Sequence, residues 1–398
     1  MKIRDFGLEI FFGRYEFSAP YLLAQSDCES LSIRELLALE PGEHVICQFP
    51  TYQSLYELLA LEPGAQEDFL DTWLGYSEND GAPALREAVS GLYTQCGPEN
   101  VLLHVGAQEA IFGALNVLVE PGEHVICQFP TYQSLYEVAR AAGCELSLCP
   151  LHQGEDGWYC DLDELERLIT LKTRLLVLNT PNNPTGYALS ADERQRICEL
   201  ARRHGLRILA DEVYRGLEAP DAVPPAFCDI YERAFSVGVL SKAYGLPGLR
   251  VGWIASQERD AIGALSRYKN YLSICCPTPS EALARIALKH GPAVLARNRE
   301  IIARNRRIAA DFFARYDHVF LHNPPQAGPI AFHGLRPDFV ARFGSALAFC
   351  EHLAQSAGVL LLPGNVYDMD APYVRMGYGR ANFAENLAVL DGWLQQNG

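Results

Sequence analysis

One lysine, Lys242, stands in a setting where an amine could act as a nucleophile or a base. It follows the mainly apolar run at 237–241 and precedes a glycine- and proline-rich loop, GLPGL at 245–249. Most lysines are solvated surface charges, but a lysine withdrawn from water has a lowered pKa and a reactive neutral amine. Arg250 follows eight residues later, and its guanidinium could bind a phosphate.

Three further polar side chains follow apolar runs that are typical of strands. Asn183 lies in NTPNNPTG at 179–186, before a proline whose peptide bond could be cis. Asp211 ends the run LRILAD, and Tyr214 follows in DEVY. Taken singly, a turn asparagine and a helix-capping aspartate are the commoner interpretations. Because α/β sheets bind ligands at the carboxyl ends of their strands, these side chains could instead face one site.

Two more features could bind anions. The turn VGAQEA at 105–110 joins a strand pattern to a helix pattern, and the backbone N–H groups at such a helix N-terminus suit a phosphate. Arg375 stands inside the apolar run YVRMGYG at 373–379, where a guanidinium needs an anionic partner. A phosphate-binding turn together with the lysine, aspartate, tyrosine and asparagine matches the requirements of pyridoxal 5′-phosphate, and Arg375 could bind a substrate carboxylate.

The segments that carry these residues alternate between strand and helix patterns from about residue 100 to 256. Strands are expected at 101–105, 124–129, 145–151, 174–180, 206–211, 234–241 and 250–256. Helices are expected at 106–119, 134–143, 161–169 and 190–205. This alternation predicts an α/β domain with a mainly parallel, seven-stranded sheet and helices on both faces. Beyond about residue 280, two long helical stretches and three strand patterns predict a smaller α+β domain.

The net charge, the apolar runs and the cysteines bear on the partners and the location of the protein. The 398 residues carry a formal net charge of −16 without a basic tract, which argues against nucleic acid or an anionic membrane as a partner. No apolar run is long enough to span a bilayer, and the N-terminal residues lack a cleavable signal pattern. The 12 cysteines are scattered without a CxxC pair. A cytoplasmic location and no metal site are therefore expected.

The chain resembles the fold type I pyridoxal-phosphate aminotransferases of classes I and II over nearly its whole length. The motifs that carry this resemblance follow the family's order: GYSENDGAPALRE, VGAQEA, FPTY, NNPTG, DEVY, SKAYGLPGLRVG, LPG and VRMGYG. Each motif is weak alone, but the ordered set is highly specific. The resemblance implies amino-group transfer between an amino acid and a 2-oxo acid, catalysed by a homodimer with shared active sites.

The resemblance also implies catalytic roles. Lys242 resembles the lysine that forms the Schiff base with the cofactor, and Asp211 resembles the partner of the pyridine nitrogen. Tyr214 and Asn183 resemble the donors to the 3′-oxygen of the ring. Arg375 resembles the arginine that binds the α-carboxylate of the substrate, beside Asn183.

The remaining implied contacts hold the cofactor. Those expected at its phosphate are Gly106, Ala107, Gln108 and Arg250, with Tyr76 reaching the phosphate of the neighbouring subunit. Tyr132 resembles the aromatic residue that stacks on the ring. The family often places Ser or Thr three residues before the lysine, where this chain has Val239. One phosphate contact is therefore in question, and Ser241 could replace it.

Two other functions compete with transamination. The lysine segment LSKAYGLPGLRVGW also resembles that of capreomycidine-synthase-like enzymes, which implies elimination with cyclisation. Acidic residues of the N-terminal arm could then bind a cationic side chain, although a structural or solvated role is the commoner one; they are Glu9, Glu16, Asp27 and Glu29. A regulator that senses the cofactor would need an appended DNA-binding domain and a basic surface, and neither is expected here.

An exact duplication complicates the N-terminal part. EPGEHVICQFPTYQSLYE occupies 40–57 and returns at 120–137, where strand and helix patterns surround it. The first copy is instead bracketed by ELLALEPG at 35–42 and 57–64, so 43–64 is interpreted as an insertion. The alternative is a surface hairpin that packs elsewhere. The expected division is an N-terminal arm with part of the small domain at 1–42, the insertion at 43–64, a large cofactor-binding domain at 65–275 and a small domain at 276–398.

Deletion of residues 43–64 is expected to leave a soluble, cofactor-loaded dimer of equal or greater stability. The physical reason is that lengthening a surface loop costs only about 0.6 kcal/mol per doubling of its length, so removing the insertion should change the free energy of unfolding little. In the first copy of the repeat, Tyr52 is the counterpart of Tyr132. Tyr52→Ala should leave catalysis unchanged, whereas Tyr132→Ala should weaken cofactor binding or slow turnover. Activity and melting temperature, compared with the full chain, test this. A deletion that prevents folding would contradict it.

Overall fold

The computed structural model describes residues 7–15, 19–26, 28–29, 74–154 and 157–397. The insertion at 43–64, including Tyr52, lies outside the described residues, and so does most of the expected segment 1–42. The boundaries of the proposed domains remain predictions. The elements that form the site all belong to the described part of the chain.

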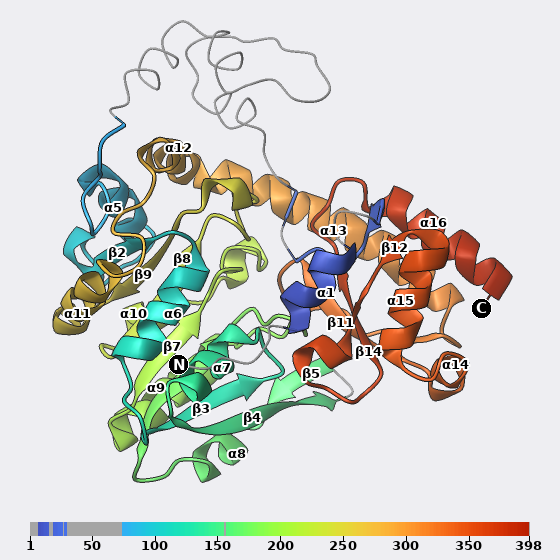
Figure 1. The fold of residues 1–398 in the computed structure, drawn as a ribbon, viewed down its shortest axis with the longest axis horizontal. Coiled ribbons are helices and arrows are strands. Elements are labelled where there is room, and N and C mark those ends of the chain that lie inside the picture. The colour runs from blue at the N-terminus through green and yellow to red at the C-terminus, as the bar shows by residue number, and fades with distance from the viewer. Residues whose placement is uncertain (1–6, 16–18, 27, 30–73, 155–156, 398) are drawn as a thin grey trace, which may run out of the picture.

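In the described part of the chain, the large sheet has eight strands in the order β2-β9-β8-β7-β6-β3-β4-β5 (Figure 1). Their bounds are β2 Val101–His104, β3 His124–Phe129, β4 Glu145–Gly154, β5 Gly157–Cys160, β6 Thr173–Asn179, β7 Arg207–Asp211, β8 Ala234–Val239 and β9 Gly252–Ser256. Strands β4, β3, β6, β7 and β8 run parallel to one another, and β9 runs antiparallel to both β8 and β2. The mainly parallel sheet is therefore confirmed, and β5 adds an eighth strand that pairs antiparallel with the extended end of β4.

Helices cover both faces of this sheet (Figure 1). They are α5 Pro83–Ser90, α6 Ala107–Val117, α7 Ser134–Ala141, α8 Leu162–Arg167, α9 Ala191–His204, α10 Phe227–Ile230 and α11 Arg259–Lys269. Short 3-10 turns lie at Pro98–Asn100, Pro220–Ala222, Pro247–Leu249 and Gly364–Tyr367. The predicted start of α9 is confirmed, because Ser190 and Glu193 form a reciprocal capping box there.

A second, antiparallel sheet lies in the C-terminal part, in the order β10-β11-β14-β13. Its strands are β10 Phe320–Leu321, β11 Ile330–Leu335, β13 Leu362–Pro363 and β14 Tyr373–Gly377. The surrounding helices are α12 Thr278–Lys289, α13 Gly291–Arg315, α14 Pro337–Ala341, α15 Ala346–Ala357 and α16 Phe383–Asn397. Helix α13 runs from the large sheet to the second one (Figure 1). Arg375 is buried in β14, opposite Phe332 of β11.

The described part of the N-terminal arm joins this C-terminal part. It contains α1 Gly7–Tyr15 and β1 Tyr21–Leu22, and β1 pairs with β12, Val359–Leu360. Further along, the Gly377 N–H donates to the carbonyl of Leu23 at 2.7 Å. Among the described residues, no helix has both the length and the apolar character that a bilayer crossing requires.

Candidate active site

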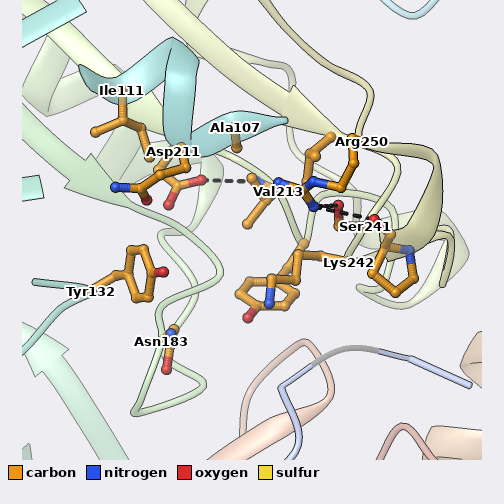
Figure 2. A pocket seen from close by; sticks show the side chains of 13 residues that line it. Ala107, Ile111, Tyr132, Asn183, Asp211, Val213, Ser241, Lys242 and Arg250 are labelled. Carbon is orange, nitrogen blue, oxygen red and sulfur yellow. Dashed lines mark hydrogen bonds between the residues drawn. The ribbon is translucent and has the colours of Figure 1, made fainter. Parts of the chain in front are cut away.

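A cavity of about 450 Å³ opens where strands β6, β7 and β8 end (Figure 2). Asn183 follows β6, Asp211 ends β7, and Lys242 follows the last residue of β8, Val239. The lining residues are Ala107, Gln108, Ile111, Tyr132, Asn183, Asp211, Val213, Tyr214, Val239, Ser241, Lys242, Pro247 and Arg250. The parallel strands point their carboxyl ends to one edge, and this is why residues far apart in sequence meet there.

One side of the cavity can bind an anion. Helix α6 begins at Ala107, so its first backbone N–H groups have no partner within the helix. Gly106 precedes it with a φ of 82°, and a Cβ there would lie 2.5 Å from Nη2 of Arg250. Arg250 donates to the Ser241 hydroxyl at 3.4 Å and to the Pro247 carbonyl at 3.2 Å, both neutral acceptors. The guanidinium charge and the helix N-terminus therefore face the same space.

Another part of the cavity holds a buried carboxylate. Asp211 accepts a hydrogen bond from the Val213 N–H at 3.3 Å. Burial raises the pKa of Asp211 to about 7, although this hydrogen bond and the charge of Lys242 act in the opposite direction. A carboxylate in this position is best compensated by a cationic donor that enters the cavity.

Lys242 lies below Asp211 and Arg250 in the view of Figure 2. Its Nζ donates to the hydroxyl of Ser26 at 3.1 Å. Tyr214 also lines the cavity, and burial raises the pKa of its phenol. The ring of Tyr132 lies on the side of the cavity that Asn183 shares (Figure 2). An amine, a phenol and an aromatic ring thus surround the same volume.

Arg375 does not line the cavity but is joined to it through Asn183. Its Nη1 donates to Oδ1 of Asn183 at 2.9 Å and to the Tyr367 hydroxyl at 2.5 Å. Its Nη2 donates to the carbonyl of Ala24 at 2.5 Å, and Nε has no hydrogen-bond partner among the described residues. Because the Tyr367 hydroxyl also donates to Oδ1 of Asn183 at 2.7 Å, the Asn183 amide N–H₂ is the group left to donate elsewhere.

Most of the residues that the sequence singles out meet here. Those lining the cavity are Ala107, Gln108, Tyr132, Asn183, Asp211, Tyr214, Ser241, Lys242 and Arg250. Gly106 precedes the lining residue Ala107, and Arg375 is hydrogen-bonded to the lining residue Asn183. Tyr76 lies apart in the single chain, and 79% of its surface is exposed. The expected cis bond between Asn183 and Pro184 is confirmed.

Sequence reasoning missed two residues, Ser26 and Tyr367. Ser26 belongs to an arm whose path the sequence does not reveal, and Tyr367 follows the LPG motif without a chemical signal of its own. Val239 is buried at the end of β8 and offers no hydroxyl to the cavity. Glu29 accepts a hydrogen bond from the Ala381 N–H at 2.6 Å, so its carboxylate has a structural partner.

The donor set fits pyridoxal phosphate. Helix N–H groups with Arg250 and Ser241 suit its phosphate, the buried Asp211 suits a protonated ring nitrogen, and Lys242 offers the amine. No group of three or more His, Cys, Asp or Glu side chains is placed to hold a metal ion within the described ranges.

The model of the family "Aminotransferase class I and II" matches residues 65–389, and the chain belongs to this family. It is an enzyme that uses pyridoxal phosphate to transfer amino groups between an amino acid and a 2-oxo acid.

Individual relatives include aminotransferases and a capreomycidine synthase. The chain is 33% identical to a capreomycidine synthase of Streptomyces vinaceus over 78% of each chain. It is 32% identical to a probable N-succinyldiaminopimelate aminotransferase of Mycobacterium tuberculosis, over 73% of this chain and 74% of that one. A solved structure of a pyridoxal-phosphate-dependent aminotransferase from Streptococcus suis superposes with a TM-score of 0.86 at 33% identity, covering 100% of this chain and 99% of that one.

Gly252→Ala is expected to weaken pyridoxal-phosphate binding by roughly tenfold, the scale of one lost charge-assisted hydrogen bond. A Cβ on Gly252 would lie 2.7 Å from the carbonyl carbon of Gly106 and 2.8 Å from the Ala107 nitrogen, so the start of α6 must shift. Gly248→Ala is the matched control, because a Cβ there meets no atom within 4 Å. Titration of each apoprotein with pyridoxal phosphate measures the effect. Equal affinities for the two variants would contradict it.

The stability of the apoprotein should depend on pH through Asp211. Its pKa rises from an ordinary 3.8 to about 7 on folding, so the native state keeps a proton that the unfolded state loses. The contribution of Asp211 to the free energy of unfolding therefore falls as pH rises from about 4 to about 7, and levels off above that. Denaturant unfolding of Asp211→Asn beside the wild type should show a difference that grows across this range. A pH-independent difference would refute the raised pKa.

Proposed function

We propose that the cavity around Lys242 is the active site for amino-group transfer, with Lys242 as the residue that carries pyridoxal phosphate. The observation that supports this most directly is that an amine, a buried carboxylate and an anion-binding helix start share one cavity. These three groups suit the aldehyde, the ring nitrogen and the phosphate of one molecule. When bound, the cofactor supplies an electron sink for the charge that develops at the substrate Cα.

We assign the phosphate to Gly106, Ala107, Gln108, Ser241 and Arg250. The N–H groups of the helix start and the guanidinium supply donors and positive charge, while the Ser241 hydroxyl stands in for one that Val239 cannot provide. This set can neutralise a dianion without a metal ion.

The ring is assigned to four other side chains. Asp211 would accept from the protonated ring nitrogen, which compensates its buried charge. Tyr132 would stack on the ring, a contact that contributes about 0.5–1.5 kcal/mol beyond area burial. Tyr214 and the amide N–H₂ of Asn183 would donate to the 3′-oxygen.

The substrate carboxylate is assigned to Arg375, with Asn183 beside it. Arg375 is fully buried, and its Nε is still without a hydrogen-bond partner among the described residues. Tyr367 and Asn183 fix the plane of its guanidinium. An amino acid bound in this way would place its Cα within reach of Lys242, whose neutral amine takes the Cα proton and holds it for return.

Elimination with cyclisation remains the second candidate, favoured by the likeness to the capreomycidine synthase. The arm offers it limited support, because Glu29 is held by the Ala381 N–H and lies 3.9 Å from Arg380. The side chains of Glu9, Glu16 and Asp27 lie outside the described residues. Release of ammonia or an olefinic product from an amino acid, without a 2-oxo acid acceptor, would favour this alternative over transamination.

We further propose that the protein acts as a homodimer. Exposed large apolar side chains cluster on two adjacent segments, at 74–76 and 271–274; they are Leu74, Tyr76, Tyr271, Leu272 and Ile274. Hydrogen bonds hold these segments together, from Thr278 Oγ1 to the Gly75 carbonyl at 3.0 Å and from Ser77 Oγ to the Cys276 carbonyl at 3.2 Å. A second copy covering this cluster would bury it and bring Tyr76 to the other subunit's phosphate.

A cytoplasmic location is also proposed, and the free thiols of the described cysteines suit it.

Lys242→Ala is expected to abolish turnover, because the variant has neither the amine that bonds the cofactor nor the base at Cα. The phosphate and ring contacts remain, so the variant should still bind pyridoxal phosphate non-covalently. For the wild type, the half-reaction is measured by adding candidate amino donors one at a time. Loss of the visible absorbance of the bound cofactor reports the reaction with each donor. Turnover by Lys242→Ala near the wild-type rate would refute the assignment.

Tyr76→Phe is expected to weaken pyridoxal-phosphate binding several-fold while leaving the dimer intact, because only the hydroxyl would reach the neighbouring phosphate. Tyr271→Phe, which removes a hydroxyl from the same exposed apolar cluster, is the control. Sedimentation gives the oligomeric state, and titration of the apoproteins gives the affinities. A monomeric wild type, or equal affinities for both variants, would contradict the shared site.

A further inference from the structure

Ser26 lies where the N-terminal arm meets the cavity. Its hydroxyl accepts a hydrogen bond from Lys242 Nζ at 3.1 Å. The same side chain also hydrogen-bonds Tyr214. Ser26 is half-buried and lies in the arm, outside the strands of the described sheets. It therefore connects two residues that we place in the catalytic machinery, although 216 positions separate it from Lys242.

The backbone of the arm is fixed on both sides of Ser26, independently of its hydroxyl. Before it, the carbonyl of Ala24 accepts from Arg375, and a Cβ on Gly377 would lie 1.7 Å from the Gln25 carbonyl oxygen. After it, the Glu29 N–H donates to the Gly379 carbonyl at 2.5 Å. Substitution of Ser26 should therefore remove the hydroxyl without releasing the arm.

We propose that Ser26 is a positioning residue for the Lys242 amine, holding it beside Tyr214 whenever the amine is not bonded to the cofactor. This inference rests on the proposed role of Lys242. A lysine has four rotatable side-chain bonds, so an amine released during the reaction would otherwise sample many positions. A hydroxyl suits the task because it can accept from the amine and donate to the phenol at the same time.

The group that positions the Lys242 amine should be neutral, because a charged group would change the protonation of the amine. Asp211, Tyr214 and Arg250 line the same cavity, and Asp211 is reserved for the ring nitrogen in the proposed function. A carboxylate at position 26 would pair with Lys242 and keep it protonated, which would disable it as a base. A serine orients the amine at a smaller cost in basicity.

The test begins with the apoprotein, where the Lys242 amine is not bonded to the cofactor. Trace acetylation with acetic anhydride at several pH values, followed by peptide mapping, gives the pKa and reactivity of Lys242. Ser26→Ala should lower that pKa, because the ammonium loses an acceptor. Ser26→Thr keeps the hydroxyl and should titrate like the wild type. Ser90→Ala is the control, because the Ser90 hydroxyl donates to the Glu87 carbonyl of helix α5.

A second measurement follows the rate at which added pyridoxal phosphate bonds to Lys242, read from its visible absorbance. Ser26→Ala should slow this rate and kcat by roughly tenfold, the scale of one hydrogen bond to a charged group, with KM changed less than about twofold. Ser26→Thr should recover most of both rates. If Ser26→Ala does not fold, Ser26→Cys, whose thiol is a weak acceptor, takes its place.

Three outcomes would overturn the inference: unchanged titration of Lys242 in Ser26→Ala, equal losses in the Ala and Thr variants, or a loss confined to KM. Failure of the proposed function gives a different result. In that case pyridoxal phosphate would bond to a lysine other than Lys242 in the wild type itself.

Discussion

Two buried ionisable side chains, Asp211 and Arg375, determine which ligands the rest of the site must bind. Among the described residues neither side chain forms a salt bridge, although the charge of Lys242 acts on Asp211, and each is held by neutral hydrogen-bonding groups. Burying a charge without a counter-charge is costly, so such residues are retained where a ligand supplies compensation. A protonated pyridine ring and an amino-acid carboxylate carry the two charges that are needed. Because Asp211 needs a cationic partner and Arg375 an anionic one, the cofactor and the substrate would bind side by side.

The fold meets these requirements with two separate parts of the chain. Asn183, Asp211 and Lys242 lie at or just after the carboxyl ends of the parallel strands β6, β7 and β8, at one edge of the large sheet. Arg375 lies in β14 of the second sheet. The Arg375–Asn183 hydrogen bond joins the two parts at the cavity. The N-terminal arm closes the remaining side, since its Ala24 carbonyl and Ser26 hydroxyl contact Arg375 and Lys242.

The large sheet and most of the cavity could be predicted because their signals are local. Apolar runs ending in a polar residue mark a strand and the side chain at its carboxyl end, which is how Asp211 and Lys242 stood out. Ser26 and Tyr367 could not be predicted in this way, because their contacts depend on the path of the arm and of the turn after β13. Strand β5 was missed because it forms a short hairpin with the end of β4, beyond the apolar run that predicted that strand. The role of Tyr76 depends on a second copy of the chain.

The central claim is that Lys242 holds the cofactor in this cavity. Reduction of the loaded enzyme with borohydride fixes pyridoxal phosphate to the amine that carries it, and peptide mapping by mass spectrometry then locates the label. The account predicts one labelled peptide, the one containing Lys242. A label on any other lysine, or a loaded enzyme that cannot be labelled at all, would contradict it.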